Sequence, residues 1–148
     1  MNWYRNTNIE KEAQTMLEST GVIRLEPKLK RLDADTTGWA IIQADQELTR
    51  YYVEQFNFAH RANDIQIMKP AWGGHISIMR GEAVKDKRLF MSFRNKTVKF
   101  QYNPEVKGNG NHFWLDVECP DAENMREQLG LPRKPHFPFH LTIGVKKG

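Results

Sequence analysis

The chain has 148 residues, of which 39% are apolar and 27% are charged, and its formal net charge is +4. This composition is typical of one globular domain and excludes a disordered or fibrous chain, and no apolar run approaches the ~18 residues of a membrane span. Cys119 is the only cysteine, which excludes a disulfide within the chain, and the N-terminal residues lack the apolar segment of a secretory signal, so we expect a cytoplasmic protein that does not insert into a membrane.

The charge is distributed unevenly along the chain. Residues 1–60 carry 7 Lys/Arg against 9 Asp/Glu, whereas residues 61–148 carry 15 against 9. The basic excess of the second part suits an anionic ligand. A mildly basic solvated surface explains the same numbers more simply.

The first elements are a helix and a strand. Apolar residues at helical spacing predict a helix over 9–18, and Gly21 is a natural stop for it. Residues 22–32 alternate between apolar and polar, which predicts a strand. Pro27 within it indicates an edge strand or an interruption, because proline cannot donate to a neighbouring strand.

The next elements form a strand-helix-strand unit. Residues 37–44 predict a buried strand, and 45–59 predict a helix with Asp45 at its N-cap and apolar residues at helical spacing. After an irregular segment, the alternation over 74–81 predicts another strand. A further strand is predicted near 87–93.

The second half repeats this arrangement. Strands are predicted over 96–102 and 112–118, joined by an Asn- and Gly-rich segment that is typical of a hairpin loop. A short helix over 121–129 is predicted to start at Asp121 and to stop at Gly-Leu-Pro. The final strand is predicted over 139–145.

Two strand-helix-strand units in one chain predict an α+β fold with internal pseudo-symmetry. We expect one domain, 1–148, with a first lobe at about 35–95. The second lobe, at about 96–148, would include the N-terminal strand. The antiparallel sheets of the two lobes would surround a central cleft.

The last strand of each unit carries the same short motif, a histidine followed two residues later by a hydroxyl residue. These are His75-Ile-Ser77-Ile and His140-Leu-Thr142-Ile. Because side chains two apart on a strand point to the same face, each motif presents an imidazole and a hydroxyl on one face and aliphatic residues on the other. One such motif alone carries little information, but two at equivalent positions predict polar faces that meet in one cleft.

Such a cleft suits cleavage of a phosphodiester without a metal. Two imidazoles near neutral pH can divide the roles of general base and general acid. Ser77 and Thr142 would bind the non-bridging phosphate oxygens, and nearby Lys or Arg would stabilise the negative charge of the transition state. The attacking group is a ribose 2′-OH, or water on a 2′,3′-cyclic phosphate.

A zinc site is the competing interpretation. His136 and His140 are four residues apart, the spacing that places two ligands on one face of a helix. Pro135 and Pro138 make a helix there unfavourable, and other candidate ligands are scarce. We therefore expect no metal and no other cofactor.

The paired motifs resemble those of the two-histidine (2H) phosphoesterase superfamily, over roughly residues 37–145. The resemblance is sharpest at His75-Ile-Ser77 and at Pro138-Phe-His140-Leu-Thr142-Ile-Gly. It implies a bilobal fold in which His75 and His140 are the catalytic acid-base pair and Ser77 and Thr142 bind phosphate. The small size, LTRYYVEQF and VECPDAENMREQLGLP are also similar to the phage anti-CBASS branch, which degrades cyclic oligonucleotide immune signals in the host cytoplasm.

A nucleotide substrate also needs surfaces for its bases, and aromatic side chains stack on any base. Trp72, in a loop three residues before His75, is the first candidate, and the glycines that follow it would let the loop approach a ligand or move as a lid. Lys69 lies in the same loop. The remaining candidates for substrate binding are Trp3, Tyr4 and Phe139, for each of which core or surface packing is the alternative.

The expected function is therefore metal-independent cleavage of a cyclic or short oligonucleotide. A long RNA is less expected, because the sequence has no dense Lys/Arg tract that could bind along its phosphate backbone. Two alternatives share the same four residues. One is an enzyme that opens 2′,3′-cyclic phosphates at RNA ends, and the other is a non-catalytic protein that sequesters a nucleotide. No membrane and no obligatory protein partner are expected, and the sequence leaves the oligomeric state open.

Overall fold

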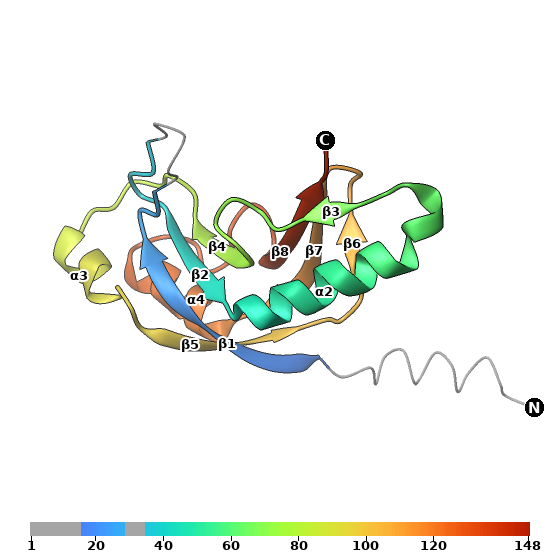
Figure 1. Ribbon diagram of the computed structural model, residues 1–148. Coiled ribbons are helices and arrows are strands. Elements are labelled where there is room, and N and C mark those ends of the chain that lie inside the picture. Colours follow the sequence, from blue (N-terminus) through green and yellow to red (C-terminus); the bar gives the residue numbers. More distant parts are fainter. Residues whose placement is uncertain (1–15, 29–34) are drawn as a thin grey trace, which may run out of the picture.

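The computed structural model describes residues 16–28 and 35–148 (Figure 1). Within these residues, eight strands alternate with three α-helices and one short 3-10 helix. The elements in chain order are β1 (Leu17–Leu25), β2 (Ala40–Ala44), α2 (Gln46–Ala59), η1 (Arg61–Asn63), β3 (Ile67–Met68), β4 (His75–Met79), α3 (Lys87–Ser92), β5 (Thr97–Tyr102), β6 (Lys107–Gly108), β7 (His112–Glu118), α4 (Pro120–Gln128) and β8 (His140–Lys146).

The strands form one antiparallel sheet in the order β3-β8-β4-β2-β1-β5-β7-β6. Because β8 also pairs with β7, the six strands from β8 through β4, β2, β1 and β5 to β7 close into a barrel. The predicted α+β class and the antiparallel pairing are therefore confirmed. The expected division into two lobes remains a prediction.

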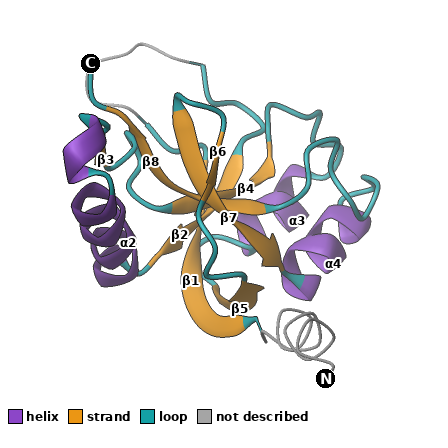
Figure 2. Ribbon diagram, turned by 90° about the vertical axis from the view of Figure 1, so that its right-hand side faces the viewer, coloured by secondary structure: helices purple, strands orange, loops and turns teal. Residues whose placement is uncertain are grey.

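The helices lie on two sides of the strands, with α2 on one side and α3 and α4 on the other (Figure 2). The predicted helix at 45–59 is confirmed as α2, with Asp45 at its N-cap, where its carboxylate accepts a hydrogen bond of 2.9 Å from the Glu47 N–H. No helix in the described ranges is long and apolar enough to cross a membrane.

The core fills the barrel with aliphatic and aromatic side chains from alternate strand positions. Along β5 the exposed residues alternate with the buried Val98, Phe100 and Tyr102, as the predicted strand at 96–102 requires. On β4 and β8 the buried positions include Ile76, Ile78, Leu141 and Ile143. Burial of these side chains fixes the register of both strands, because a shift by one residue would turn the aliphatic face toward solvent.

The N-terminal predictions are corrected in part. Most of the helix predicted over 9–18 lies outside the described residues, but Leu17 and Glu18 belong to β1. Gly21 is no helix stop. It lies within β1, paired with Ala44 and Val98, where a Cβ would come within 2.4 Å of the Ile42 side chain. Of the strand predicted over 22–32, the described part belongs to β1, which ends at Leu25, before Pro27, which cannot donate to the ladder; residues 29–32 lie outside the described residues.

Two further predictions are wrong. The segment near 87–93 is the helix α3, not a strand, and the Asp86 carboxylate caps it by accepting a 3.0 Å hydrogen bond from the Leu89 N–H. The helix predicted over 121–129 is confirmed as α4, but it begins at Pro120 with Cys119 as the N-cap, so the predicted start at Asp121 is wrong and Asp121 lies in the first turn. Proline at the first helical position is favourable, because that N–H has no partner within the helix.

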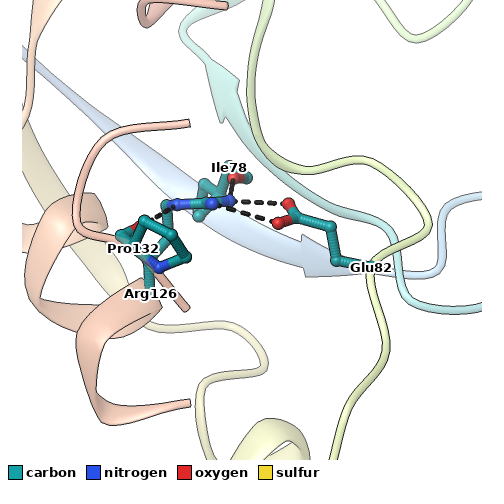
Figure 3. A network of polar contacts seen from close by, with 4 residues as sticks. All are labelled: Ile78, Glu82, Arg126 and Pro132. Carbon is teal, nitrogen blue, oxygen red and sulfur yellow. Dashed lines mark hydrogen bonds and ion pairs between the residues drawn. The ribbon is translucent and has the colours of Figure 1, made fainter. Parts of the chain in front are cut away.

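One buried arginine joins α4 to the strand that carries the first histidine motif (Figure 3). The Arg126 side chain is 2% exposed and makes two hydrogen bonds to the Glu82 carboxylate, of 2.6 and 3.0 Å. It also donates to the carbonyl of Ile78 at 2.9 Å and to that of Pro132 at 2.7 Å. The guanidinium therefore fixes β4, the loop that follows it and the end of α4 relative to one another.

Candidate active site

The two histidine motifs lie side by side on neighbouring antiparallel strands. His75 on β4 pairs with Thr142 on β8, and Ile76 pairs with Leu141. A local two-fold axis through the second pair therefore relates His75 to His140 and Ser77 to Thr142. The four polar side chains share the outer face of the barrel, while the aliphatic residues between them face the core. The predicted meeting of the two polar faces is confirmed.

Both imidazoles are held by the backbone in the same way. His75 Nδ1 lies 2.8 Å from the carbonyl oxygen of Gly73, and His140 Nδ1 lies 2.8 Å from the carbonyl oxygen of Pro138. Since a carbonyl can only accept, each Nδ1 carries the proton that is donated. In the neutral ring Nε2 is then the basic nitrogen, and each Nε2 is left for a ligand.

The Gly-Gly pair before His75 is explained by packing against α2. A Cβ on Gly74 would lie 1.9 Å from Thr49 Oγ1, and Gly73 has φ +68°, which favours glycine. Both glycines are buried. They let the turn that binds His75 Nδ1 sit against the first turn of α2, and Gly73 also lines the second cavity, so a close approach of this loop to a ligand remains a prediction.

A cavity of about 850 Å³ opens over the four motif residues. This volume lies within the ~300–1,000 Å³ range of small-molecule sites. Its walls are rich in aromatic side chains, which are Trp39, Trp72, Trp114 and Phe137. The cavity can therefore hold a ligand that offers flat rings to these side chains and a polar group to the imidazoles.

Each imidazole has a tryptophan beside it. The rings of Trp72 and His75 are 5.3 Å apart at 73°, and those of Trp114 and His140 are 5.9 Å apart at 61°. Trp39 in turn contacts Trp72 edge to face at 5.8 Å. The tryptophans therefore continue the approximate symmetry of the two motifs into the walls of the cavity.

The charged groups of the cavity favour an anion. Arg80 lies over the Phe137 ring at 5.2 Å, and Lys107 forms an ion pair with Asp116, which is opposite His140 in the sheet. Asp116 is the only carboxylate among the lining residues in the described ranges 16–28 and 35–148. With the histidines neutral, Arg80 therefore leaves the lining with a net positive charge.

The two histidines have different surroundings. Burial lowers the pKa of His75 below its usual 6.5, against the raising effect of the Gly73 carbonyl, and the positive charges of His140 and Arg80 lower it further. His75 is therefore neutral at pH 7, with Nε2 able to accept a proton.

Of the residues expected to bind the substrate, some line the cavity and others lie elsewhere. Trp72 lines the cavity as expected, whereas Lys69 lines an adjoining second cavity. Phe139 is 7% exposed and packs in the core, because it precedes His140 and so points to the opposite face. Its neighbour Phe137 lines the cavity instead. Trp3 and Tyr4 lie outside the described residues.

Other lining residues were not predicted, and these include Trp39, Trp114, Lys107, Asn109 and Asp116. Alternation along 112–118 places His112, Trp114 and Asp116 on one face, and this is the sequence pattern that could have indicated a role in the site. That face reaches the motifs because β7 pairs with β8, which puts Trp114 opposite Thr142. This pairing brings together strands far apart in the sequence.

Within residues 16–28 and 35–148, no three His, Cys, Asp or Glu side chains cluster as a metal site would require. Independence from metal remains a prediction for experiment. Comparison with protein-family models, curated proteins and solved structures finds no match for this chain.

Proposed function

We propose that this chain is a phosphodiesterase that cleaves cyclic or short oligonucleotides with His75 and His140 as its acid-base pair. The observation that carries the proposal is the matched pair of imidazoles, each fixed through Nδ1 by a backbone carbonyl. A hydroxyl residue accompanies each imidazole in the same cavity. This arrangement matches the 2H phosphoesterase pattern that the sequence resembles.

In the proposed reaction His75 is the base and His140 the acid. His75 Nε2 removes the proton from the attacking oxygen, which is a ribose 2′-OH or water, and that oxygen bonds to phosphorus. The bond from phosphorus to the leaving oxygen breaks, and His140, acting in its charged form with a proton on each ring nitrogen, donates the Nε2 proton to that oxygen. The lowered pKa of His75 supports its role, since only a neutral imidazole can accept the proton.

Ser77, Thr142 and Arg80 serve the phosphate. All three line the cavity with the histidines. The two hydroxyls donate to the non-bridging oxygens, and the Arg80 guanidinium stabilises the charge that develops on them. The aromatic walls stack the bases, which is tolerant of sequence.

A bilobal 2H-like architecture is part of the same proposal, supported by the local two-fold relation between β4 and β8. The resemblance to the anti-CBASS branch further suggests cyclic oligonucleotide immune signals as substrates and a viral enzyme acting in the host cytoplasm. The limited volume and aromatic walls of the cavity suit such a compact ligand better than a long duplex.

The test is a cleavage panel in the presence of EDTA. The substrates are 3′,3′-cyclic dinucleotides, cyclic trinucleotides, 2′-5′ oligoadenylate and an RNA with a terminal 2′,3′-cyclic phosphate. His75→Ala and His140→Ala are each expected to lower kcat about 10²–10⁴-fold, the usual contribution of a general acid or base. His136→Ala, in an exposed position outside the cavity lining, is the matched control and is expected to keep the wild-type rate.

Each other outcome has a defined meaning. Cleavage of the RNA terminus alone would replace the proposed substrate with RNA ends. Tight binding with intact ligand recovered after denaturation would identify a sequestering protein. Near-normal rates in either motif variant would contradict the acid-base assignment, and loss of activity in EDTA would contradict the metal-free mechanism.

A further inference from the structure

A second cavity of about 680 Å³ adjoins the first at Trp72, which lines both. It differs from the first in its charge. Among the described residues, four cationic side chains line it, against one carboxylate, that of Glu26; the cations are Arg24, Lys28, Lys69 and Arg94. A cavity with this excess of positive charge favours an anionic ligand.

The strand register places the second cavity on the same outer face of the barrel as the histidine motifs. Ser77 on β4 is opposite Ile41 on β2, which is opposite Arg24 on β1. Neighbouring strands are about 4.8 Å apart, so the backbone at Arg24 lies about 10 Å from the backbone at Ser77. A single-stranded ligand can span this separation while it remains bound at both places.

Hydrogen bonds hold Arg24 in the second cavity. Its Nε donates to Gln43 Oε1 at 3.2 Å, and its Nη1 donates to Asn95 Oδ1 at 2.8 Å. Gln43 also approaches the Trp72 carbonyl, with Nε2 3.5 Å from that oxygen. Among the residues that the structure describes, these two bonds leave three of the five guanidinium N–H groups of Arg24 for a ligand.

The cations of this cavity are not neutralised by the carboxylate beside them. One Glu26 oxygen accepts a hydrogen bond of 3.1 Å from the Gly38 N–H. Within the described ranges, Arg24, Lys69 and Arg94 form no ion pair. Their charge is therefore available to a bound anion.

We propose that the second cavity binds the phosphate next to the one that is cleaved. The inference rests on the proposed function and deepens it. The substrate class becomes an oligonucleotide with at least two phosphates, one at the histidines and one at Arg24 and Lys69, with a base against Trp72 between them. A nucleotide with one phosphate occupies only the first cavity.

A matched pair of trinucleotides tests the proposal. One carries two charged phosphodiesters. In the other, one of the two linkages is a neutral methylphosphonate, so that the length and the bases are unchanged. We expect wild-type kcat/KM to be about tenfold higher for the doubly charged substrate, as expected for a charge-assisted contact. The double variant Arg24→Gln/Lys69→Gln is expected to lose this preference.

The double variant Lys85→Gln/Arg88→Gln is the charge-matched control, because both side chains are exposed and line neither cavity. It is expected to keep the preference. Equal rates for both trinucleotides, or a preference that survives in Arg24→Gln/Lys69→Gln, would overturn the second phosphate site and leave the phosphodiesterase proposal intact.

Absence of cleavage of either trinucleotide would instead count against the proposed function, and binding would then decide the second site. Affinity for the doubly charged compound that depends on Arg24 and Lys69 would support it. Equal affinities of the wild-type protein for both compounds would overturn it.

Discussion

At the scale of single residues, the site contains two histidines with the same backbone hydrogen bond but different surroundings. Trp72 covers His75 on the side of the second cavity, and burial is the main reason that the pKa of His75 is lowered. A tryptophan is therefore expected to influence acid-base chemistry without taking part in it. Its effect can be measured without any substrate.

Trp72→Ala is expected to raise the pKa of His75 toward 6.5, because water then reaches the ring and stabilises the charged form. An NMR titration of the histidine side chains measures this shift directly. Phe58→Ala removes a 64% exposed aromatic residue on α2 and is the control, with no change expected at His75. An unchanged or further lowered pKa in Trp72→Ala would show that this side chain does not cause the burial.

The four motif residues were predictable because their pattern is local. Alternation over three positions fixes which side chains share a face, and the motif occurs twice. Phe139 shows the limit of that reasoning. It is an aromatic residue beside a motif, yet the same alternation that turns His140 outward turns Phe139 into the core. Trp39 and Trp114 were missed because their distance from the histidines depends on strand pairing between remote segments.

At the scale of elements, the strands and helices with strong periodicity were predicted, whereas the six-residue helix α3 and the two-residue strands β3 and β6 were not. α2 was predictable because an N-cap aspartate precedes a long amphipathic segment. α3 has only six residues, too few to show a helical period. The N-cap residue Asp86 is the feature of the sequence that indicates a helix rather than a strand. The continuation of β1 through Gly21 could not be predicted, because it depends on two neighbouring strands.

The attachment of α4 to β4 depends on one arginine, which gives a prediction about stability. Arg126→Met is expected to lower the free energy of unfolding by about 3 kcal/mol, the lower range for breaking a buried ion pair. The variant leaves Glu82 without its partner and removes the donor for the Ile78 carbonyl. Chemical denaturation provides the measurement.

Arg133→Met is the matched control. Arg133 also pairs with glutamates, Glu123 and Glu127, but its side chain is 43% exposed. Exposed pairs contribute about 0–1 kcal/mol, so this variant should remain close to the wild type. A similar small loss for Arg126→Met would show that the buried network does not hold α4 in place.

At the scale of the whole molecule, closure of the barrel buries the aliphatic side of β4 and β8 and turns both motifs to one outer face. That outer face continues from β7 and β8 across β4 to β2 and β1, under both cavities. The site therefore lowers the stability of the folded protein at acidic pH, because the fold holds a histidine where burial disfavours its charged form.

The unfavourable burial of charged His75 predicts a pH dependence of global stability. The pKa of His75 is lower in the folded protein than in the unfolded chain, so the unfolded chain binds more protons as the pH falls. The contribution of His75 to stability is complete above about pH 6.5 and is lost as the pH decreases toward the folded-state pKa. Denaturation midpoints between pH 7 and pH 5 should therefore fall less steeply for His75→Gln than for the wild type. His136→Gln, at an exposed position, is the control, and parallel curves for His75→Gln and the wild type would contradict the burial of His75.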